Sequence, residues 1–516
     1  MVPCRFGRVV RGEPCNRMTS SAETSLLSAS RHVSAGVMWN TAFTFSKDAL
    51  QFGLTMILAR LLTPEVYGQF GFVSSITTFA AAVSFRSFLS HVLQLGNEEN
   101  VDYDLHMTFA IVIQSSLFVL MNIVGIAFWF SPALRPTAIP LMAMSVLLFL
   151  DIPSEVYSRM LERSLEWSTL RALNMVGFIT GALVSLILAT RGAGVFALLI
   201  PNLIAPIPLI VHLFRKGWQA HWKWAPAEFK VPFRFGLFRI ASGLLSQGRT
   251  LIESVTVAAL LSFAGLGLYG RATGLAQLFV FRSVFLLMTS AYPVLTTLLA
   301  GTRHASRAAI MLLRVVCWGS ATAGVFLALG SQPIITLVYG RQWIAAIPLV
   351  GAAVLSRAAA GYRYATTSLL LADNQARRCV ALDAIALALF CVALSALWTS
   401  ARLFLVLDGA VQIGVAIFGV FWLARKERGL FLALLRPLLE AAVVTTVVMA
   451  LVRFGMPKVG GIAPVLFLAV AATLLVLFLF RLLFGREVDA ITRVLPLRSV
   501  TRRFFLLRDS QLVPDA

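Results

Sequence analysis

Charged residues are scarce in this sequence: Asp, Glu, Lys and Arg make up 13% of its 516 residues. Soluble domains average about 25% charged and about 45–50% apolar residues. Here 59% of the residues are hydrophobic and the mean hydropathy is +0.84. This balance excludes a water-soluble enzyme, and it also excludes a disordered or fibrous chain. A membrane-spanning helix needs about 20 mostly apolar residues, so the composition predicts a protein that crosses the membrane many times.

Motifs for metals, cofactors and nucleotides are also lacking. The five cysteines form no CxxC pair and the six histidines show no metal-ligand spacing, so we expect no disulfide framework, metal or cofactor. No GxxxxGK[ST] loop is present, so ATP does not drive the protein directly. The stretch from Met1 to about Arg31 is basic and polar without a hydrophobic core. It therefore predicts no cleaved signal peptide, and Met18 is an alternative start.

Apolar runs separated by Pro, Gly or charged residues predict 14 membrane-spanning segments. A first set of six lies near 36–59, 67–92, 106–130, 137–158, 169–190 and 194–214. A second set of six lies near 235–263, 267–297, 307–330, 342–372, 379–400 and 402–424. Two more lie near 438–456 and 461–483. Backbone polar groups find no partner in hydrocarbon, so the spans must be helices and the fold class is all-α.

The net charge of +21 indicates the orientation of the chain and not a nucleic-acid partner. With a cytoplasmic N-terminus, 29 of the 44 lysines and arginines fall in cytoplasmic segments and seven in outside loops. Basic residues collect on the cytoplasmic side, so both termini are predicted inside. One loop departs from this rule, because its residues Glu98, Glu99, Asp102 and Asp104 are acidic. The other eight basic residues lie within predicted spans.

A short repeat indicates two related halves. LLTPEVYGQFG (61–71) aligns without gaps with LLSFAGLGLYG (260–270), and both lie at the turn between the first two spans of a set. With a long basic loop between the sets, this predicts two pseudo-symmetric six-helix lobes and a site between them, the plan of a transporter. The predicted units are a basic cytoplasmic N-tail (1–33), an N-lobe (34–214), a cytoplasmic linker (215–234), a C-lobe (235–424), two further helices (425–484) and a basic cytoplasmic C-tail (485–516).

Several longer stretches match the pattern of one family in the same order. They are ILARLLTPEVYGQFGFVSSI (57–76), RMLERSLEWSTLRALNMVGF (159–178), GAGVFALLIPNLIAPI (192–207), LLSFAGLGLYGRATGLAQL (260–278) and VYGRQWIAAIPLV (338–350). From about residue 34 to 430 the chain resembles the polysaccharide exporters. These are the O-antigen and exopolysaccharide flippases of the multidrug/oligosaccharidyl-lipid/polysaccharide superfamily. Arg86 departs from the pattern, because a small residue such as glycine is expected there.

The resemblance implies a V-shaped bundle of two lobes that alternates between inward-open and outward-open states in the inner membrane. The implied substrate is an undecaprenyl-diphosphate-linked oligosaccharide, moved to the outer leaflet for O-antigen or exopolysaccharide biosynthesis. A polymerase or ligase of the same pathway would act next, and membrane lipids are further expected partners. In the similar lipid II flippases, cationic residues of the central cavity engage the lipid diphosphate.

Basic residues within the spans are the candidate substrate-binding groups. An ionisable side chain at mid-bilayer costs roughly 2.5–3.5 kcal/mol on insertion scales, so it usually faces a cavity or a partner. Four such residues lie near mid-depth in spans of both lobes: Lys47, Arg249, Arg282 and Arg357. Arginine grips a diphosphate through paired donors and lysine acts as a point charge. Arg271 precedes Arg282 by close to three helical turns, which predicts that the two share a face and line a path for the substrate.

Structural roles are the alternative for several of these side chains. Arg249 and Glu253 are spaced i,i+4 and can neutralise one another, and Arg271 can anchor the chain at the interface. Asp48 and Glu253 are the best-placed acids for coupling to H⁺ or Na⁺, unless each is a static counter-ion of its basic neighbour. Asp383 and Asp408 are further acids within spans. Three basic residues near cytoplasmic span ends can reach lipid phosphates: Arg86, Arg239 and Arg363.

Three functions are compatible with this plan. The leading prediction is a lipid-linked oligosaccharide flippase. A multidrug or organic-cation exporter of the same superfamily is the first alternative, but a cavity for cations favours carboxylates, whereas these spans hold more bases than acids. A membrane glycosyltransferase or polymerase generally needs a sizeable external loop, and the longest predicted outside loop has about a dozen residues.

Overall fold

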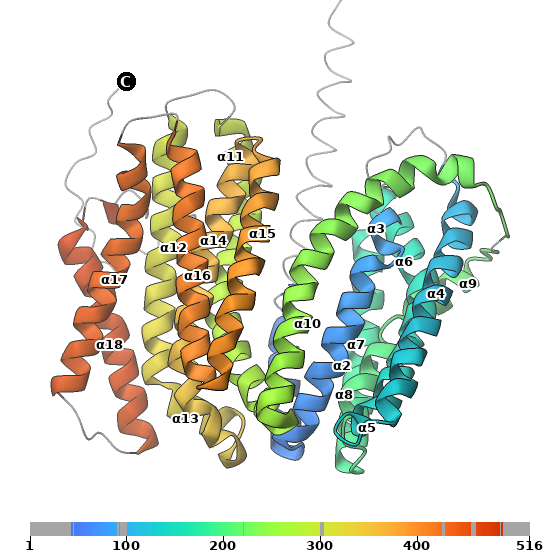
Figure 1. Cartoon of the computed structure of the whole chain (residues 1–516), viewed down its shortest axis with the longest axis horizontal. Coiled ribbons are helices and arrows are strands. Elements are labelled where there is room, and N and C mark those ends of the chain that lie inside the picture. The colour runs from blue at the N-terminus through green and yellow to red at the C-terminus, as the bar shows by residue number, and fades with distance from the viewer. Residues whose placement is uncertain are drawn as a thin grey trace, which may run out of the picture.

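The computed structural model describes residues 43–44, 46–89, 92, 101–219, 221–299, 304–425, 429–455, 461–485 and 487–488. Every regular element in these ranges is a helix, which confirms the all-α fold class (Figure 1). Twelve helical segments of this part are long and apolar enough to cross a membrane. The chain is therefore a multi-pass membrane protein.

The helices of the first half closely follow the predicted spans. They are a helix over residues 46–61, α2 (Pro64–Val83), α3 (Arg86–Leu89), α4 (Tyr103–Trp129), α5 (Arg135–Ser145), α6 (Leu147–Arg163), α7 (Trp167–Thr190), α8 (Phe196–Ile204) and α9 (Ile207–Arg215). Three predicted spans are each divided into two helices: α2 with α3, α5 with α6, and α8 with α9. Pro206 stands between α8 and α9, where a proline lacks the N–H that would continue the first helix.

The second half contains longer helices and three short irregular ones. They are α10 (Pro226–Ala276), the π-helix η2 (Gln277–Phe281), α11 (Arg282–Leu299), α12 (His304–Leu329), α13 (Ser331–Val338), the 3₁₀-helix η3 (Arg341–Ala346), α14 (Ile347–Ala372), α15 (Ala376–Ala393), the 3₁₀-helix η4 (Leu394–Trp398), α16 (Ala401–Ala424), α17 (Leu430–Gly455) and α18 (Ile462–Leu483).

Helix α10 joins two predicted spans across a kink. Ser262 has φ 66° and ψ 174°, outside the helical region, so the chain turns there between the seventh and eighth predicted spans. These two spans form one candidate segment, Gly243–Thr289. The first predicted span, 36–59, lies partly outside the described residues. The predicted number of 14 spans is therefore not confirmed.

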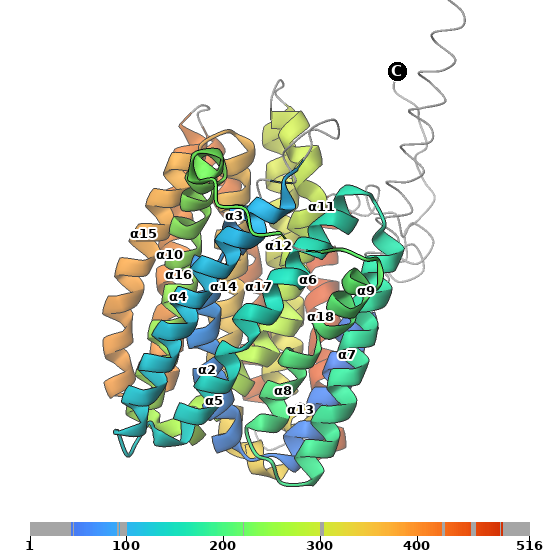
Figure 2. The same cartoon turned by 90° about the vertical axis from the view of Figure 1, so that its right-hand side faces the viewer.

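The helices form two groups that meet at one end. In Figure 1 the groups lie close together at the end that carries α5 and α13 and are separated at the opposite end. Figure 2 shows α2 to α9 in front of the second group, with the long helices running along a common direction. The charge count predicts that the end with α5 and α13 faces outside. Helix α10 packs against α2 and α3 and also against α14, so it connects the two groups.

The repeat detected in the sequence forms the contact at the closed end. A Cβ on Gly68 would lie 1.7 Å from the carbonyl oxygen of Phe263, and a Cβ on Gly267 would lie 1.9 Å from that of Pro64. The offset of the repeat relates Gly68 to Gly267 and Pro64 to Phe263. The two halves therefore cross through a pair of equivalent backbone contacts, and each contact needs a residue without a side chain.

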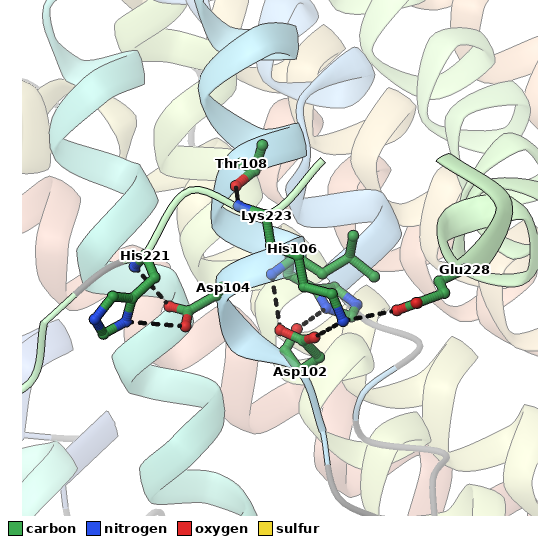
Figure 3. A network of polar contacts seen from close by, with 8 residues as sticks. Asp102, Asp104, His106, Thr108, His221, Lys223 and Glu228 are labelled. Atoms are coloured by element: carbon green, nitrogen blue, oxygen red, sulfur yellow. Dashed lines mark hydrogen bonds and ion pairs between the residues drawn. The ribbon is translucent and has the colours of Figure 1, made fainter. Parts of the chain in front are cut away.

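The acidic loop that departed from the charge rule is bound to the basic linker (Figure 3). Lys223 Nζ lies 2.5 Å from an Asp102 oxygen and 2.9 Å from a Glu228 oxygen, and His221 Nδ1 lies 3.4 Å from an Asp104 oxygen. We call these five residues the linker clamp. The acidic side chains thus neutralise basic groups on the same side of the protein. Glu98 and Glu99 lie outside the described residues.

The linker clamp holds the linker backbone as well as its side chains. The His221 amide donates to Asp104 at 3.1 Å, and the Lys223 amide donates to the Thr108 hydroxyl at 3.0 Å. Partial burial acts to raise the pKa of Asp102, but hydrogen bonds from Lys223 and the Leu105 amide outweigh it and lower this pKa below its usual value. The hydrogen bonds to Asp102 and Glu228 raise the pKa of Lys223.

Lys223→Gln is expected to loosen the linker, seen as severalfold faster hydrogen exchange at the amides of His221 and Lys223 at pH 7. Because the pKa of Asp102 is depressed, its contacts protect these amides from exchange above its unfolded pKa of about 3.9. This protection is lost as the pH falls through the pKa of Asp102 in the folded protein. Because the pKa of Lys223 is raised, its contacts protect the amides below its unfolded pKa of about 10.4. This protection is lost as the pH rises through the pKa of Lys223 in the folded protein. Protection factors of the wild type should therefore fall at both extremes.

Lys230→Gln provides the matched control, because this exposed lysine of α10 lies outside the linker clamp. Its protection factors should equal those of the wild type. Unchanged exchange at both amides in Lys223→Gln would contradict the role assigned to the clamp.

Candidate transport cavities

A cavity of about 1080 Å³ lies between α2, α10, α11, α14 and α15. At one end its lining includes Tyr67, next to the contact that closes the bundle. At the other end it includes Leu371 and Cys379, near the turn between α14 and α15. The charge count predicts that this turn is cytoplasmic. We call this space the large cavity; it reaches from the closed end of the bundle toward the separated end.

Most of the positive charge in the large cavity is neutralised by acids. Arg249 Nη2 lies 2.6 Å from an oxygen of Asp408 on α16, and Arg363 Nη1 lies 2.6 Å from an oxygen of Asp383 on α15. Arg357 Nη2 lies 3.9 Å from a Glu253 oxygen, which also accepts the Tyr269 hydroxyl. The predicted neutralisation of Arg249 by Glu253 is wrong, because packing brings a closer acid from α16.

Asp408 is the centre of a buried network within the second half. It is 3% exposed and accepts the Ser356 hydroxyl at 2.6 Å and the Gln412 amide at 3.2 Å, besides pairing with Arg249. Gln412 in turn accepts Arg363 Nε at 2.5 Å. Several donors surround this carboxylate, which therefore links α10, α14 and α16.

Arg271 is bound by aromatic rings. Its guanidinium carbon lies 3.8 Å from the ring centroid of Tyr67, 5.5 Å from that of Tyr339 and 5.7 Å from that of Trp343. Trp343 Nε1 donates to the Ala59 carbonyl at 2.8 Å, which ties this aromatic cluster across the closed end. No carboxylate lies within ion-pair distance of Arg271 in the described part of the chain. A desolvated cation over an aromatic face is stabilised by about 2 kcal/mol.

Arg282 does not follow Arg271 into the large cavity. The π-helix η2 lies between them and changes the helical register, so the expectation of a shared face along a regular helix fails. Arg282 Nη2 lies 2.9 Å from an Asp48 oxygen, an ion pair between α11 and the helix over 46–61. Within the described residues, Arg282 lines neither cavity.

A second cavity, of about 380 Å³, lies among the helix over 46–61, α2, α7 and α8. We call it the N-lobe cavity. Its lining includes three cations, Lys47, Arg171 and Arg271, and none of the described residues that line it is acidic. Arg271 and Tyr67 line both cavities and so stand at their common wall.

The predicted cations are thus divided between two cavities. Arg249, Arg271 and Arg357 line the large cavity, and Lys47 and Arg271 line the N-lobe cavity. Arg171 was missed, because it was counted with the basic residues of the cytoplasmic loop although it lies within the predicted span 169–190. Helix α7 begins at Trp167, so Arg171 projects from its second turn, and its position inside the predicted span was the signal that could have identified it.

Two residues assigned to lipid phosphates have acidic partners instead. Arg86 Nη2 lies 2.8 Å from an Asp151 oxygen and 3.2 Å from a Glu155 oxygen, and Arg363 pairs with Asp383. The unusual arginine in the second span is therefore bound to acids at the end of the fourth. The side chain of Arg239 lies outside the described part of the structure.

Two helical lobes around charged cavities at membrane depth define a membrane transporter. The sequence model of the family described as "polysaccharide biosynthesis protein" matches residues 57–348, more than half of the chain. The chain belongs to this family, and the resemblance found in the sequence is confirmed.

Two curated proteins are similar over much of the chain. The succinoglycan biosynthesis transport protein ExoT of Rhizobium meliloti (strain 1021) is 21% identical over 336 residues, 63% of this chain and 66% of that protein. The teichuronic acid biosynthesis protein TuaB of Bacillus subtilis (strain 168) is 20% identical over 331 residues, 63% of this chain and 68% of that protein. The matched region thus spans about two thirds of each relative's length.

Solved structures show the same fold. The lipid II flippase MurJ, in an inward closed conformation, has a TM-score of 0.66 at 12% identity, covering 88% of this chain and all of that one. A multidrug resistance MATE family transporter of the MOP superfamily, in an inward-facing conformation, has a TM-score of 0.51 at 15% identity, covering 74% of this chain and 95% of that one. These names, with that of the succinoglycan transport protein, confirm the prediction of a transporter and not an enzyme.

Proposed function

We propose that this protein moves an undecaprenyl-diphosphate-linked oligosaccharide from the cytoplasmic to the outer leaflet of the inner membrane, for O-antigen or exopolysaccharide biosynthesis. The family supports a polysaccharide precursor as cargo, and relatives named for succinoglycan transport and teichuronic acid biosynthesis agree with it. In this proposal both termini are cytoplasmic, and a polymerase or ligase of the same pathway acts on the product.

The observation that carries the proposal is the sign of the charge inside the bundle. Among the described residues, six basic side chains line the two cavities: Lys47, Arg171, Arg249, Arg271, Arg357 and Arg363. Asp408, Glu253 and Asp383 pair with three of them, and Lys47, Arg171 and Arg271 are left without an acidic partner in this part of the chain. An excess of cations in a low-dielectric interior attracts an anion such as a lipid diphosphate. The same charge would repel an organic cation.

Alternating access gives the mechanism. The large cavity extends from the closed outer end toward the predicted cytoplasmic end, so this conformation suits loading from the cytoplasmic leaflet. Release would need the glycine contacts and the aromatic cluster around Arg271 to separate. Coupling to H⁺ or Na⁺ through Asp48 or Glu253 would need each acid to leave its arginine, Arg282 or Arg357, during the cycle.

The proposal predicts flipping of a glycolipid by the purified full-length protein in proteoliposomes. The probe is a fluorescent undecaprenyl-diphosphate-linked oligosaccharide, and its exposure is followed with a membrane-impermeant glycosidase. We expect the cleaved fraction to rise well above that of protein-free vesicles. Cleavage equal to protein-free vesicles, with export of an organic cation dye instead, would replace the proposal by the multidrug alternative.

A further inference from the structure

We propose that the N-lobe cavity holds the phosphate groups of the glycolipid, while the large cavity holds its sugars. This rests on the proposed function and deepens it, because it divides the substrate between two subsites. The division follows from the different charge, pairing and polar lining of the two cavities.

Charge separates the two cavities more clearly than size does. In the large cavity Arg249, Arg357 and Arg363 each have a carboxylate partner. In the N-lobe cavity, Lys47 and Arg171 lie within ion-pair distance of no carboxylate in the described part of the chain. Ion pairs leave little net attraction for a further anion, whereas cations without a carboxylate partner attract one.

The pairing of the neighbouring acids keeps the N-lobe cavity positive. Glu162, on α6, acts on Arg171 only at longer range and is bound to Arg159 at 2.5 Å. Asp48 follows Lys47 in the chain, but it pairs with Arg282 and does not line the cavity. Within the described part of the chain, these two neighbouring acids are therefore held by other arginines.

Two residues that line this space carry hydrogen-bond donors without a partner in the described part of the chain. The Nε of Arg171 and the hydroxyl of Tyr67 are buried without a hydrogen-bond partner among the described residues. The polar part of the lining is completed by three amide and two hydroxyl side chains: Gln51, Asn174, Asn202, Thr55 and Ser185. A buried donor without a partner is unfavourable, and phosphate oxygens accept several hydrogen bonds at once. A phosphate group would relieve this cost.

The large cavity has the chemistry of a sugar site. Its lining combines hydroxyl groups, aromatic rings and ion pairs whose free edges can bond sugar hydroxyls; Ser246, Thr250, Ser254, Tyr292 and Tyr364 are examples. Because Arg271 and Tyr67 line both cavities, a phosphate on one side lies next to the first sugar on the other. The order of the subsites thus matches the order of groups along the lipid.

Binding measurements on the purified full-length protein test this division with two probes, undecaprenyl diphosphate and the same lipid carrying the oligosaccharide. Arg171→Gln and Lys47→Gln should each weaken both probes by about tenfold or more, since hydrogen bonds to charged groups are lost. Arg171→Lys keeps the charge and should lose less. The double variant Thr250→Val/Ser254→Ala should weaken only the glycan-bearing probe.

Arg191→Gln is the matched control, because it removes an arginine at the exposed end of the same helix, α7, outside both cavities. It should bind both probes as the wild type does. If Arg171→Gln and Lys47→Gln bind both probes normally, while Arg249→Gln weakens undecaprenyl diphosphate, the division is wrong and the proposed function stands. If the wild type binds neither probe, the proposed function fails and the division with it.

Discussion

Gly68→Ala is expected to separate the lobes at their closed end, and Gly267→Ala to do the same from the other half of the repeat. The new methyl groups would lie 1.7 Å and 1.9 Å from backbone carbonyl oxygens, which cannot rotate away as a side chain could. Overpacking of this kind costs about 1–3 kcal/mol, enough to shift a two-state equilibrium by about 5- to 150-fold. Transport should fall by a comparable factor, because the state that loads substrate is depopulated.

The repeat supplies matched controls for this experiment. A Cβ on Gly71 or Gly270, one turn along each helix, would meet nothing within 4 Å, so alanine there should preserve the closure. The readout is the distance between spin labels on Arg191→Cys and Arg402→Cys, at the predicted outer ends of the two lobes, with the natural cysteines replaced. Longer distances are expected for the Gly68 and Gly267 variants alone. Distance distributions identical to those of the wild type would show that these glycine contacts do not hold the closed end together.

Hydropathy predicted the helices well because each span must carry its own apolar residues. It could not predict how the spans end inside the bundle. The turn at Ser262 depends on a non-glycine residue with a positive φ, and the division at Pro206 leaves the apolar run unbroken. The repeat was visible as LLTPEVYGQFG and LLSFAGLGLYG, but the sequence could not predict that the two segments pack against each other.

The candidate site could be predicted as a set of charges but not as a set of pairs. Depth along a span identified Arg249 and Arg357, whereas their partners depend on which helices become neighbours. Asp408 is 159 residues from Arg249 in the chain and 2.6 Å from it in space. A single π-helical turn changes the register between Arg271 and Arg282, and no sequence pattern predicted that turn. Local spacing therefore favoured Glu253 as the partner of Arg249, and packing decided otherwise.

Asp408→Asn is expected to destabilise the protein by about 3–5 kcal/mol, because it leaves the charge of Arg249 within the bundle without a partner. Arg249 sits on α10, which packs against both halves, and its pairing with Asp408 attaches α10 to α16. The variant should therefore unfold at lower temperature in detergent and should also transport poorly. Thermal unfolding of the purified protein measures the first effect.

The double variant Arg249→Gln/Asp408→Asn distinguishes two causes of instability, the loss of the ion pair itself and the unpaired charge left on Arg249. With both charges removed, the buried cation no longer needs a counter-ion, so most of the stability should return. Asp383→Asn removes the acid of another arginine pair, but its side chain is 45% exposed, and water should limit the change to about 1 kcal/mol or less. A double variant as unstable as Asp408→Asn would mean that Asp408 acts through Ser356 and Gln412. Stability would then reside in the hydrogen bonds within α14 and α16, and α10 would be free to move with the first half.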